Sequence, residues 1–244
     1  MLAPVAPHPF PLTPRTPHAR WEERIRRLPP LEGALGDAGR CVVVAPHPDD
    51  ETLGVGGLVG AMGAAGREVR VVAVTDGEAS HPDQPGLACR RRREQQRALR
   101  LLGWRVAIDR LGLGDGQVAD EVDALRSALR DRVDGASLLV APWRGDGHPD
   151  HDAAGRAAAA VAEEVGIRLL SYPVWLWQWA EEDAVDGLAL RRLDLPPSLQ
   201  RAKAQAVACF RSQTEDGGDG PVLTEAVRAR AAWPWEVVVD EPAA

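Results

Sequence analysis

The chain has 244 residues, of which 45% are hydrophobic, and this is enough apolar material for one well-packed core. Its formal net charge of −7 argues against a nucleic-acid binder that depends on phosphate neutralisation. Three widely spaced cysteines without a CxxC pair indicate neither a disulfide framework nor a thiolate zinc site, and they favour a reducing cytoplasm.

The N-terminal segment is unusually rich in proline. Residues 1–20 contain six prolines, which fix φ and remove backbone donors, so we expect this segment to drape or dangle without forming a strand or a helix. The next stretch, RWEERIRRLPP, predicts a short helix. No run of 18 apolar residues occurs, so we expect no membrane span and no signal peptide. We assign residues 1–40 to a proline-rich arm and 41–244 to the folded domain.

From Cys41 onward, predicted strands and helices alternate. The run CVVVA predicts a buried strand, Thr52–Ala65 a helix of small residues, and EVRVVAVT a second strand. The next predicted elements are a helix over Leu87–Leu102, the strand RVAIDRL, a helix over Glu121–Arg132, the strand SLLVAP, and an alanine-rich helix after His151. This alternation predicts a Rossmann-like, doubly wound, largely parallel sheet with helices on both faces.

After RLLSYPV the alternation weakens, but no second domain is indicated. We expect a strand near Leu190, a helix over Pro197–Phe210, a Gly/Asp loop over 215–220 and a last strand WEVVV. Trp175, Trp177 and Trp179 are spaced by two and would share one face of an extended segment. Core packing is the favoured interpretation, while a wall for a sugar face or a hydrophobic aglycone, together with Trp143, is the alternative.

Two short polar motifs follow predicted strands and carry three of the six histidines. The first, PHPDDE, contains His47, Asp49, Asp50 and Glu51. The second, GDGHPDH, contains Asp146, His148, Asp150 and His151. In an open α/β sheet, ligands bind beyond the carboxyl ends of the strands, which is where both motifs are predicted to lie.

A bound divalent metal explains this composition economically, because clustered imidazoles and carboxylates need a cation to offset their repulsion. Helix capping and turn formation would explain one motif alone, since aspartate is common at helix starts and in turns. Capping, however, does not require histidine and does not explain a repeated His-Pro-Asp. The two motifs together therefore favour a functional site.

The sequence resembles the LmbE-like, or PIG-L, family of zinc-dependent N-acetylglucosaminyl deacetylases, because APHPDDETLG is followed about a hundred residues later by GHPDH. The resemblance covers the chain from about Cys41 to the helix after His151. It implies that His47, Asp50 and His151 bind zinc, that Asp49 is the general base and that His148 faces the substrate carbonyl. Residues 41–244 would then form the deacetylase domain.

The chemistry of these residue types agrees with such roles. A zinc ion with three protein ligands keeps a position for water and lowers its pKa to about 7, so a neighbouring carboxylate such as Asp49 can take the proton. A protonated His148 would stabilise the oxyanion, with Asp150 helping to hold its imidazolium. Asp49 would then deliver the proton to the leaving amine.

Several further residues are candidates for substrate contacts. Asp146 and Glu51 complete the acidic set and would orient a ligand, cap a helix or contact a sugar hydroxyl. Asp76, in TDGE, is expected as a wall residue at the end of a strand. The family resemblance places Arg91 of RRREQQRALRLLG in a slot that often reaches the substrate. Trp143 completes the set.

A rival interpretation starts from the glycine-rich stretch GVGGLVG at 54–60. It follows a strand, and Asp76 lies about twenty residues on, as in a dinucleotide-binding fingerprint of an oxidoreductase. The turn before it, however, holds three carboxylates that would repel a pyrophosphate, so close packing of a helix on the sheet is favoured.

We therefore predict a zinc-dependent hydrolase that removes an N-acyl group, expected to be N-acetyl, from an amino sugar or sugar conjugate. The same residues would serve an amidase acting on a non-sugar amide or a thiol conjugate, which is the main alternative. Fe²⁺ or another divalent metal would also suit two histidines and one carboxylate. The expected partner is a small N-acetyl sugar or glycoconjugate, not a nucleic acid.

Overall fold

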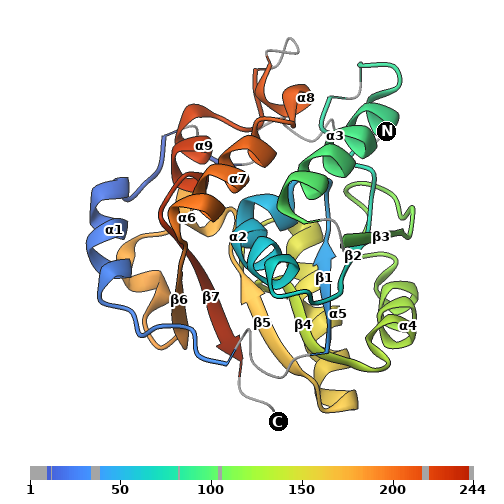
Figure 1. Cartoon of the computed structure of the whole chain (residues 1–244). Coiled ribbons are helices and arrows are strands. Elements are labelled where there is room, and N and C mark those ends of the chain that lie inside the picture. Colours follow the sequence, from blue (N-terminus) through green and yellow to red (C-terminus); the bar gives the residue numbers. More distant parts are fainter. Residues whose placement is uncertain are drawn as a thin grey trace.

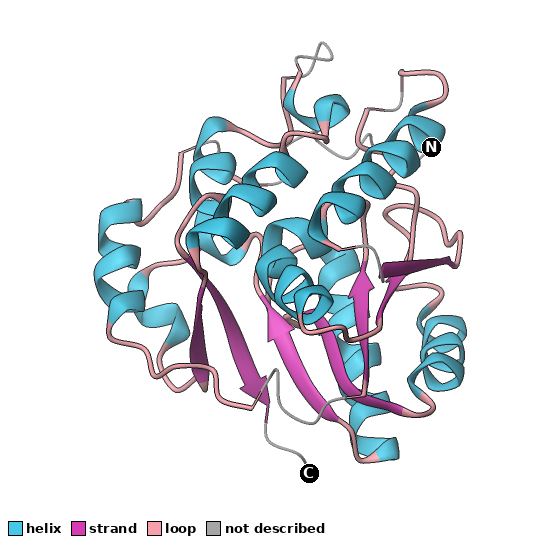
Figure 2. Cartoon of the chain, in the orientation of Figure 1, coloured by secondary structure: helices cyan, strands magenta, loops and turns pink. Residues whose placement is uncertain are grey.

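A seven-stranded sheet forms the centre of the molecule, in the order β3-β2-β1-β4-β5-β7-β6 (Figure 2). The computed structural model describes residues 10–11, 13–33, 39–81, 83–103, 106–215 and 220–241. The strands are β1 (Arg40–Ala45), β2 (Val69–Ala73), β3 (Val106–Arg110), β4 (Ala136–Pro142), β5 (Arg168–Tyr172), β6 (Leu190–Asp194) and β7 (Trp235–Glu241). Strands β1 to β5 pair in parallel, whereas β7 is antiparallel to both of its neighbours.

Helices cover both faces of this sheet (Figure 1). Those described are α1 (His18–Arg26), α2 (Asp50–Ala64), α3 (Leu87–Leu102), α4 (Val122–Val133), α5 (Pro149–Val165), α6 (Leu176–Trp179), η1 (Glu182–Val185), α7 (Pro197–Val207), α8 (Arg211–Thr214) and α9 (Glu225–Ala231). Because side chains alternate along a strand, Val43 packs with α2, α3, α7 and α9 while Val42 and Val44 pack with α4 and α5. The predicted single α/β domain with a largely parallel sheet is confirmed.

A third apolar cluster lies against β6 and β7 and includes part of the predicted arm. Trp21 and Ile25 of α1 are each 1% exposed, and the Trp21 ring meets Trp177 edge-on at 5.1 Å between centroids. Leu31 donates its backbone N–H to Arg192 in β6 at 2.7 Å. The helix predicted after residue 20 is thus present, beginning slightly earlier, and residues 13–33 pack on the domain. The division into an arm and a domain stays a prediction.

The tryptophan segment differs from the extended form that its spacing allowed. Leu176–Trp179 forms the short helix α6, so the three tryptophans do not share one face of a strand. Trp177 is 4% exposed and belongs to the core, as expected, whereas Trp175 and Trp179 are half-buried. The short helices α8 and α9 were not predicted. Residues 216–219 of the predicted Gly/Asp loop lie outside the described residues.

The glycine-rich stretch lies inside α2 and does not form a loop. A Cβ atom at Gly54 would overlap the ring of Tyr172 in β5, and one at Gly57 would overlap Leu195. The glycines therefore let the helix pack closely against its neighbours, as favoured above. The alternative of a dinucleotide-binding loop at this position is wrong, because such a loop needs free backbone N–H groups ahead of the helix.

The order of the strands decides where the two polar motifs lie. Strands β1 and β4 are direct neighbours, and the strand order reverses between them: β2 and β3 extend from one side of β1, and β5 follows on the other. The first motif follows the carboxyl end of β1 and the second follows that of β4. Ligands bind at such switch points of open α/β sheets.

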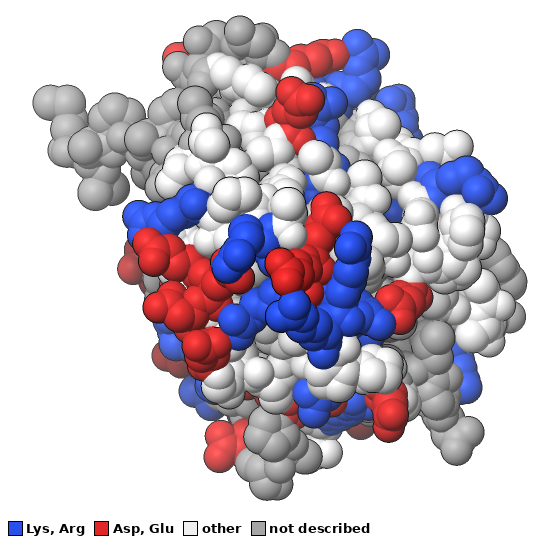
Figure 3. Space-filling model, turned by 90° about the vertical axis from the view of Figure 1, so that its left-hand side faces the viewer, with Lys and Arg blue, Asp and Glu red and all other residues white. Residues whose placement is uncertain are grey.

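The surface near α1 mixes charges of both signs. Figure 3 shows basic and acidic side chains interleaved on this face. Arg20 and Arg24 of α1 pair with Glu182 and Asp186 at 2.8 and 2.5 Å. Such exposed pairs contribute little stability and form no single-sign field that would attract a polyanion. Within the described ranges, no helix is both long and apolar enough to cross a membrane.

Candidate metal centre and active site

The first motif turns sharply from β1 into α2. Pro46 follows the strand, and α2 begins at Asp50. The backbone N–H of His47 donates to Asp50 Oδ2 at 2.9 Å and closes the turn. His47, Asp49 and Asp50 are 8%, 4% and 2% exposed. The turn thus holds an imidazole and two carboxylates away from bulk solvent.

The second motif forms the start of α5, earlier than predicted. Pro149 occupies the first turn, where a missing N–H costs nothing. His148 caps the helix, because its Nδ1 accepts a hydrogen bond from the backbone N–H of Asp150 at 3.2 Å. Asp150 and His151 lie in the first turn and are 0% exposed. Capping is therefore performed here by a histidine, and both following side chains are turned into the protein.

Three atoms from the two motifs form a nearly equilateral triangle. Asp50 Oδ2 lies 3.2 Å from His47 Nδ1 and 3.1 Å from His151 Nε2. The two ring nitrogens lie 3.3 Å apart. The structure thus brings together the three side chains that were predicted to bind the metal, and each offers an atom that ligates divalent cations.

This triangle matches the dimensions of a zinc site. Zinc is tetrahedral with bonds of about 2.0–2.1 Å to nitrogen and oxygen, so its ligand atoms lie about 3.3–3.4 Å apart. The sides of the triangle, 3.1–3.3 Å, agree with that spacing. Three protein ligands also leave a coordination position for water or substrate, as catalytic sites require. The residues present therefore fit a catalytic zinc ion.

The second nitrogen of each histidine contacts carboxylates. Nδ1 of His151 lies 2.8 Å from Asp146 Oδ2, and Nε2 of His47 lies 3.1 Å from both Asp115 Oδ1 and Asp150 Oδ2. These contacts would keep a proton on each outer nitrogen when His47 Nδ1 and His151 Nε2 bind a metal. Such partners orient the ring and raise the basicity of a metal ligand.

Asp146 contacts His151 and the backbone that leads into α6, in agreement with the expectation that it orients a ligand. It is 0% exposed, and besides His151 its carboxylate accepts hydrogen bonds from the backbone N–H groups at the start of α6, those of Val174, Trp175 and Leu176, at 2.9–3.0 Å. Asp146 therefore connects the α6 segment to His151. Its contact with a substrate hydroxyl stays a prediction.

Asp115 was missed in the sequence. It lies in the loop after β3, and its Oδ2 also accepts the backbone N–H of Ala79 at 2.7 Å. A signal existed, because GLGDGQ places an aspartate between glycines just beyond a predicted strand, as in the two recognised motifs. The strand itself gives no indication that its loop reaches across β2 to His47, which follows β1, so the contact was not predictable.

The predicted base, Asp49, pairs with Arg91. The Arg91 Nη2 donates to Asp49 Oδ2 at 3.1 Å, and its Nη1 donates to the carbonyl oxygen of Gly77 at 2.8 Å. Burial raises the pKa of Asp49 above its usual range, and the neighbouring Arg91 charge opposes that rise. Arg91 is 3% exposed, and in this structure it holds Asp49 in place. The expected contact of Arg91 with substrate stays a prediction.

The charges of the site are arranged to hold a cation. Burial would lower the pKa of His151, but Asp50 and Asp146 outweigh it and raise that pKa to about 9. His47 likewise has a raised pKa, because Asp115, Asp150 and Asp50 outweigh its burial. Burial would raise the pKa of Asp50, yet the two histidines hold it well below its ordinary value. Protons on the histidines thus balance the carboxylates in the place where a divalent metal would do so.

His148 differs from the other two histidines and from its expected protonated form. Burial, together with the charges of His47 and His151, lowers its pKa to about 3, so it is neutral near pH 7. Its Nδ1 accepts the N–H of Asp150, which places the remaining proton on Nε2. The Asp150 carboxylate, expected to hold His148, instead accepts the backbone N–H groups of Gly116 and Val118 and contacts His47.

The remaining candidates are Asp76, Trp143 and Glu51. Asp76 pairs with Arg92 and Arg110 at 3.4 and 3.6 Å, and Trp143 is half-buried beside the cluster near β6. Their contacts with substrate stay predictions. Glu51 is 0% exposed and accepts hydrogen bonds from Thr52 and Gln95 at 2.9 and 3.1 Å. Burial raises the pKa of Glu51 to about 8, so it is mostly neutral at pH 7.

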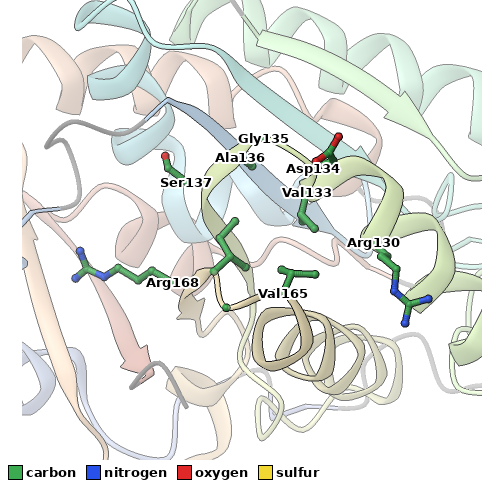
Figure 4. Close-up of a pocket in the computed structure, with 10 residues that line it drawn as sticks. Arg130, Val133, Asp134, Gly135, Ala136, Ser137, Val165 and Arg168 are labelled. Atoms are coloured by element: carbon green, nitrogen blue, oxygen red, sulfur yellow. The ribbon is translucent and has the colours of Figure 1, made fainter.

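A separate pocket lies at the opposite edge of the sheet (Figure 4). It is lined by the loops that lead into the amino ends of β4 and β5, whereas the polar motifs follow the carboxyl ends of their strands. The two arginines in its wall, Arg130 and Arg168, pair with Glu164 and Asp240. The pocket thus has no role in the metal centre.

Fold and site together define an α/β protein with a buried centre of two histidines and one carboxylate for a divalent metal. Residues 42–162 match the PIG-L family, described as GlcNAc-PI de-N-acetylase. A conserved protein of Thermus thermophilus has a similar structure, with a TM-score of 0.64, 27% identity, and coverage of 84% of this chain and 95% of that one.

Two curated relatives are named as deacetylases. The diacetylchitobiose deacetylase of Thermococcus kodakarensis is 31% identical over 141 residues, covering 54% of this chain and 52% of that protein. A 1D-myo-inositol 2-acetamido-2-deoxy-alpha-D-glucopyranoside deacetylase of Mycolicibacterium gilvum is 29% identical over 189 residues, covering 64% and 65%. The matched part thus spans about half of the first relative and less than two thirds of the second. The family match places residues 42–162 of this chain in the PIG-L, or LmbE-like, family.

Proposed function

We propose that this protein is a zinc-dependent deacetylase that hydrolyses the N-acetyl amide of an amino sugar or sugar conjugate to acetate and a free amine. The observation that carries the proposal is the triangle of His47 Nδ1, Asp50 Oδ2 and His151 Nε2 with sides of 3.1–3.3 Å, directly beside the carboxylate of Asp49. Zinc bound there would lower the pKa of water to about 7 and polarise the acyl carbonyl.

Asp49 supplies the proton transfers in this proposal. Its carboxylate is one residue from the ligand Asp50 and is held in place by Arg91. Because burial raises its pKa, Asp49 is a better base than an exposed aspartate. It accepts the proton of the attacking water at a carboxylate oxygen and then donates it to the amide nitrogen. The carbon–nitrogen bond breaks, and acetate and the amine leave.

His148 stabilises the developing oxyanion as a neutral donor. Its Nδ1 is occupied by the N–H of Asp150, so the proton on Nε2 is available for the carbonyl oxygen of the substrate. A hydrogen-bond donor aimed at developing negative charge in a site with little water lowers the activation barrier by about 3–4 kcal/mol. This role needs no imidazolium, which the lowered pKa of His148 disfavours.

The substrate class is supported by the two curated relatives. One is named for diacetylchitobiose, and the other for an inositol-linked acetamido-glucopyranoside. Both names describe an acetamido sugar joined to a further group, so an N-acetylated sugar conjugate is the substrate that we propose here. Zinc is proposed as the metal because the separations of the three candidate ligand atoms are close to those around a tetrahedral zinc ion.

The test combines metal analysis with product detection. The purified full-length chain should bind one equivalent of zinc and release acetate from N-acetylglucosamine conjugates, while a sample prepared with Fe²⁺ shows whether iron supports the same turnover. Turnover restricted to non-sugar N-acetyl amides would instead support an amidase. Absence of bound divalent metal together with absence of acetate release would refute the proposal.

A further inference from the structure

An aromatic residue of the N-terminal segment lies beside the metal centre. The ring of Phe10 stacks on Trp175, with centroids 4.8 Å apart and planes inclined by 12°. The same ring lies 6.4 Å from the imidazole of His148. Phe10 is 31 residues before Cys41, outside the matched family region, yet it reaches the second motif.

Hydrogen bonds fix this segment to the chain around α6. The carbonyl oxygen of Pro11 accepts the side chain of Gln178 at 3.2 Å, and the N–H of Arg15 donates to the carbonyl of Gln178 at 3.0 Å. Thr16 Oγ1 donates to the carbonyl of Ala180 at 2.9 Å. In Figure 1 the blue segment before α1 runs to the upper side of the molecule, where the parallel strands end. The position of Phe10 is thus set by contacts on its C-terminal side.

A glycine allows the ring to approach the second motif. Gly147 has φ of +90°, and a Cβ atom there would lie 2.9 Å from the Trp179 indole nitrogen and 3.4 Å from Phe10 Cε1. The Trp179 indole N–H donates to the carbonyl oxygen of Asp146 at 2.7 Å and holds this turn. Rings therefore line the turn that carries His148.

The stack differs from the aromatic core nearby. Trp21 and Trp177 are 1% and 4% exposed and pack edge-on inside the cluster near β6. Phe10, Trp175 and His148 are all half-buried, so part of this aromatic surface faces solvent beside a polar centre. Aromatic side chains present large, rigid apolar faces, and such faces favour flat partners.

We propose that Phe10 and Trp175 form an aromatic subsite for the aglycone of the substrate, specifically a flat apolar group joined to the amino sugar. The proposal rests on the proposed function, which places the scissile amide against His148. The ring centroid of Phe10 lies 6.4 Å from that of His148, so a substituent of a sugar bound against His148 is within reach of the Phe10 ring. A rigid pair of nearly parallel rings suits an aryl group better than a flexible chain.

The test measures binding without turnover. Phenyl and methyl β-glucosaminides carry a free amine and no acyl group, so the zinc-loaded, full-length chain can be titrated with each by calorimetry. We expect the phenyl glycoside to bind about tenfold more tightly than the methyl glycoside. Phe10→Ala should reduce this ratio to less than about twofold, while Phe10→Tyr, which keeps the ring, should preserve it. Arg15→Ala is the matched control, because it removes an exposed side chain of the same segment and should leave the ratio unchanged.

Two results would overturn the proposal: equal binding of the two glycosides by the wild-type chain, or a ratio that survives Phe10→Ala. If Phe10→Ala changed the preference for longer N-acyl chains and kept the affinity ratio of the two glycosides, that result would also overturn the proposal, in favour of a subsite for the acyl group. A ratio that depends on Phe10 in a chain that releases no acetate would refute the proposed function and still support the subsite.

Discussion

His47 Nδ1 lies 3.3 Å from His151 Nε2, although the two residues are 104 positions apart in the chain. Two like imidazoles approach this closely because Asp50 lies between them and carboxylates hold their outer nitrogens. In the metal-free protein, contacts among the three candidate ligands therefore hold them in the geometry of a metal site. The arrangement also separates the residues that would bind the metal from those that position them.

Removing a ligand and removing the base should have different consequences. His151→Ala deletes a corner of the triangle, so we expect it to lose stoichiometric zinc. Asp49→Asn keeps the triangle, so it should retain zinc while kcat falls by about 10²–10⁴-fold. Metal analysis and acetate release on the same preparations distinguish the two. Near-normal kcat in Asp49→Asn would exclude Asp49 as the base.

Asp115 should act through His47 without binding the metal. Asp115→Asn weakens its hold on His47 Nε2, and loss of such a partner typically costs about 10–100-fold in metal affinity. Competition with a chromogenic chelator measures this affinity. Asp123→Asn, an exposed acidic residue in α4, is the matched control and should bind zinc like the wild type. Equal affinities in the two variants would show that Asp115 does not position the ligand.

Zinc binding should become stronger as pH rises. In the metal-free protein the pKa of His151 is about 9, above its usual 6.5, so this ring is protonated at pH 6–8 and must lose its proton to ligate the metal. Affinity should therefore increase about tenfold per pH unit for each proton released over this range. Calorimetry in two buffers with different ionisation enthalpies counts those protons. An affinity independent of pH between 6 and 8 would contradict the arrangement.

Close packing of α2 on the sheet can be tested at its glycines. Gly54→Ala places a methyl group inside the ring of Tyr172, and such overpacking typically lowers the free energy of unfolding by about 1–3 kcal/mol. Gly56→Ala is the matched control in the same helix, where the nearest side-chain atom lies 3.4 Å away. It should leave stability unchanged or raise it by about 0.5–1 kcal/mol, because alanine favours a helix. Chemical denaturation compares the two, and equal stabilities would contradict the packing.

The strongest sequence signals were local ones. Apolar runs such as CVVVA predict buried strands, and their alternation with helices predicts a doubly wound sheet, because period and length depend on neighbouring residues. The start of α5 was placed too late, since the cap is a histidine and not one of the usual small polar residues. The spacing of the tryptophans was ambiguous, because a spacing of two residues permits an extended segment but does not require one. In the structure, the Asp146 carboxylate accepts the backbone N–H groups of Val174 and Leu176, and a helical turn follows.

By itself, the sequence determined the alternation of strands and helices from β1 to α5 and the two histidine-containing motifs, and the family resemblance of those motifs implied the candidate ligands and base. Only the tertiary structure decided that β1 and β4 are neighbours, that Asp115 and Asp146 hold the outer nitrogens of His47 and His151, and that Phe10 lies beside His148. The periodicity of apolar residues within one segment indicates which face of a helix or strand is buried. Contacts between distant loops depend on how the elements pack, and no periodicity within one segment encodes that.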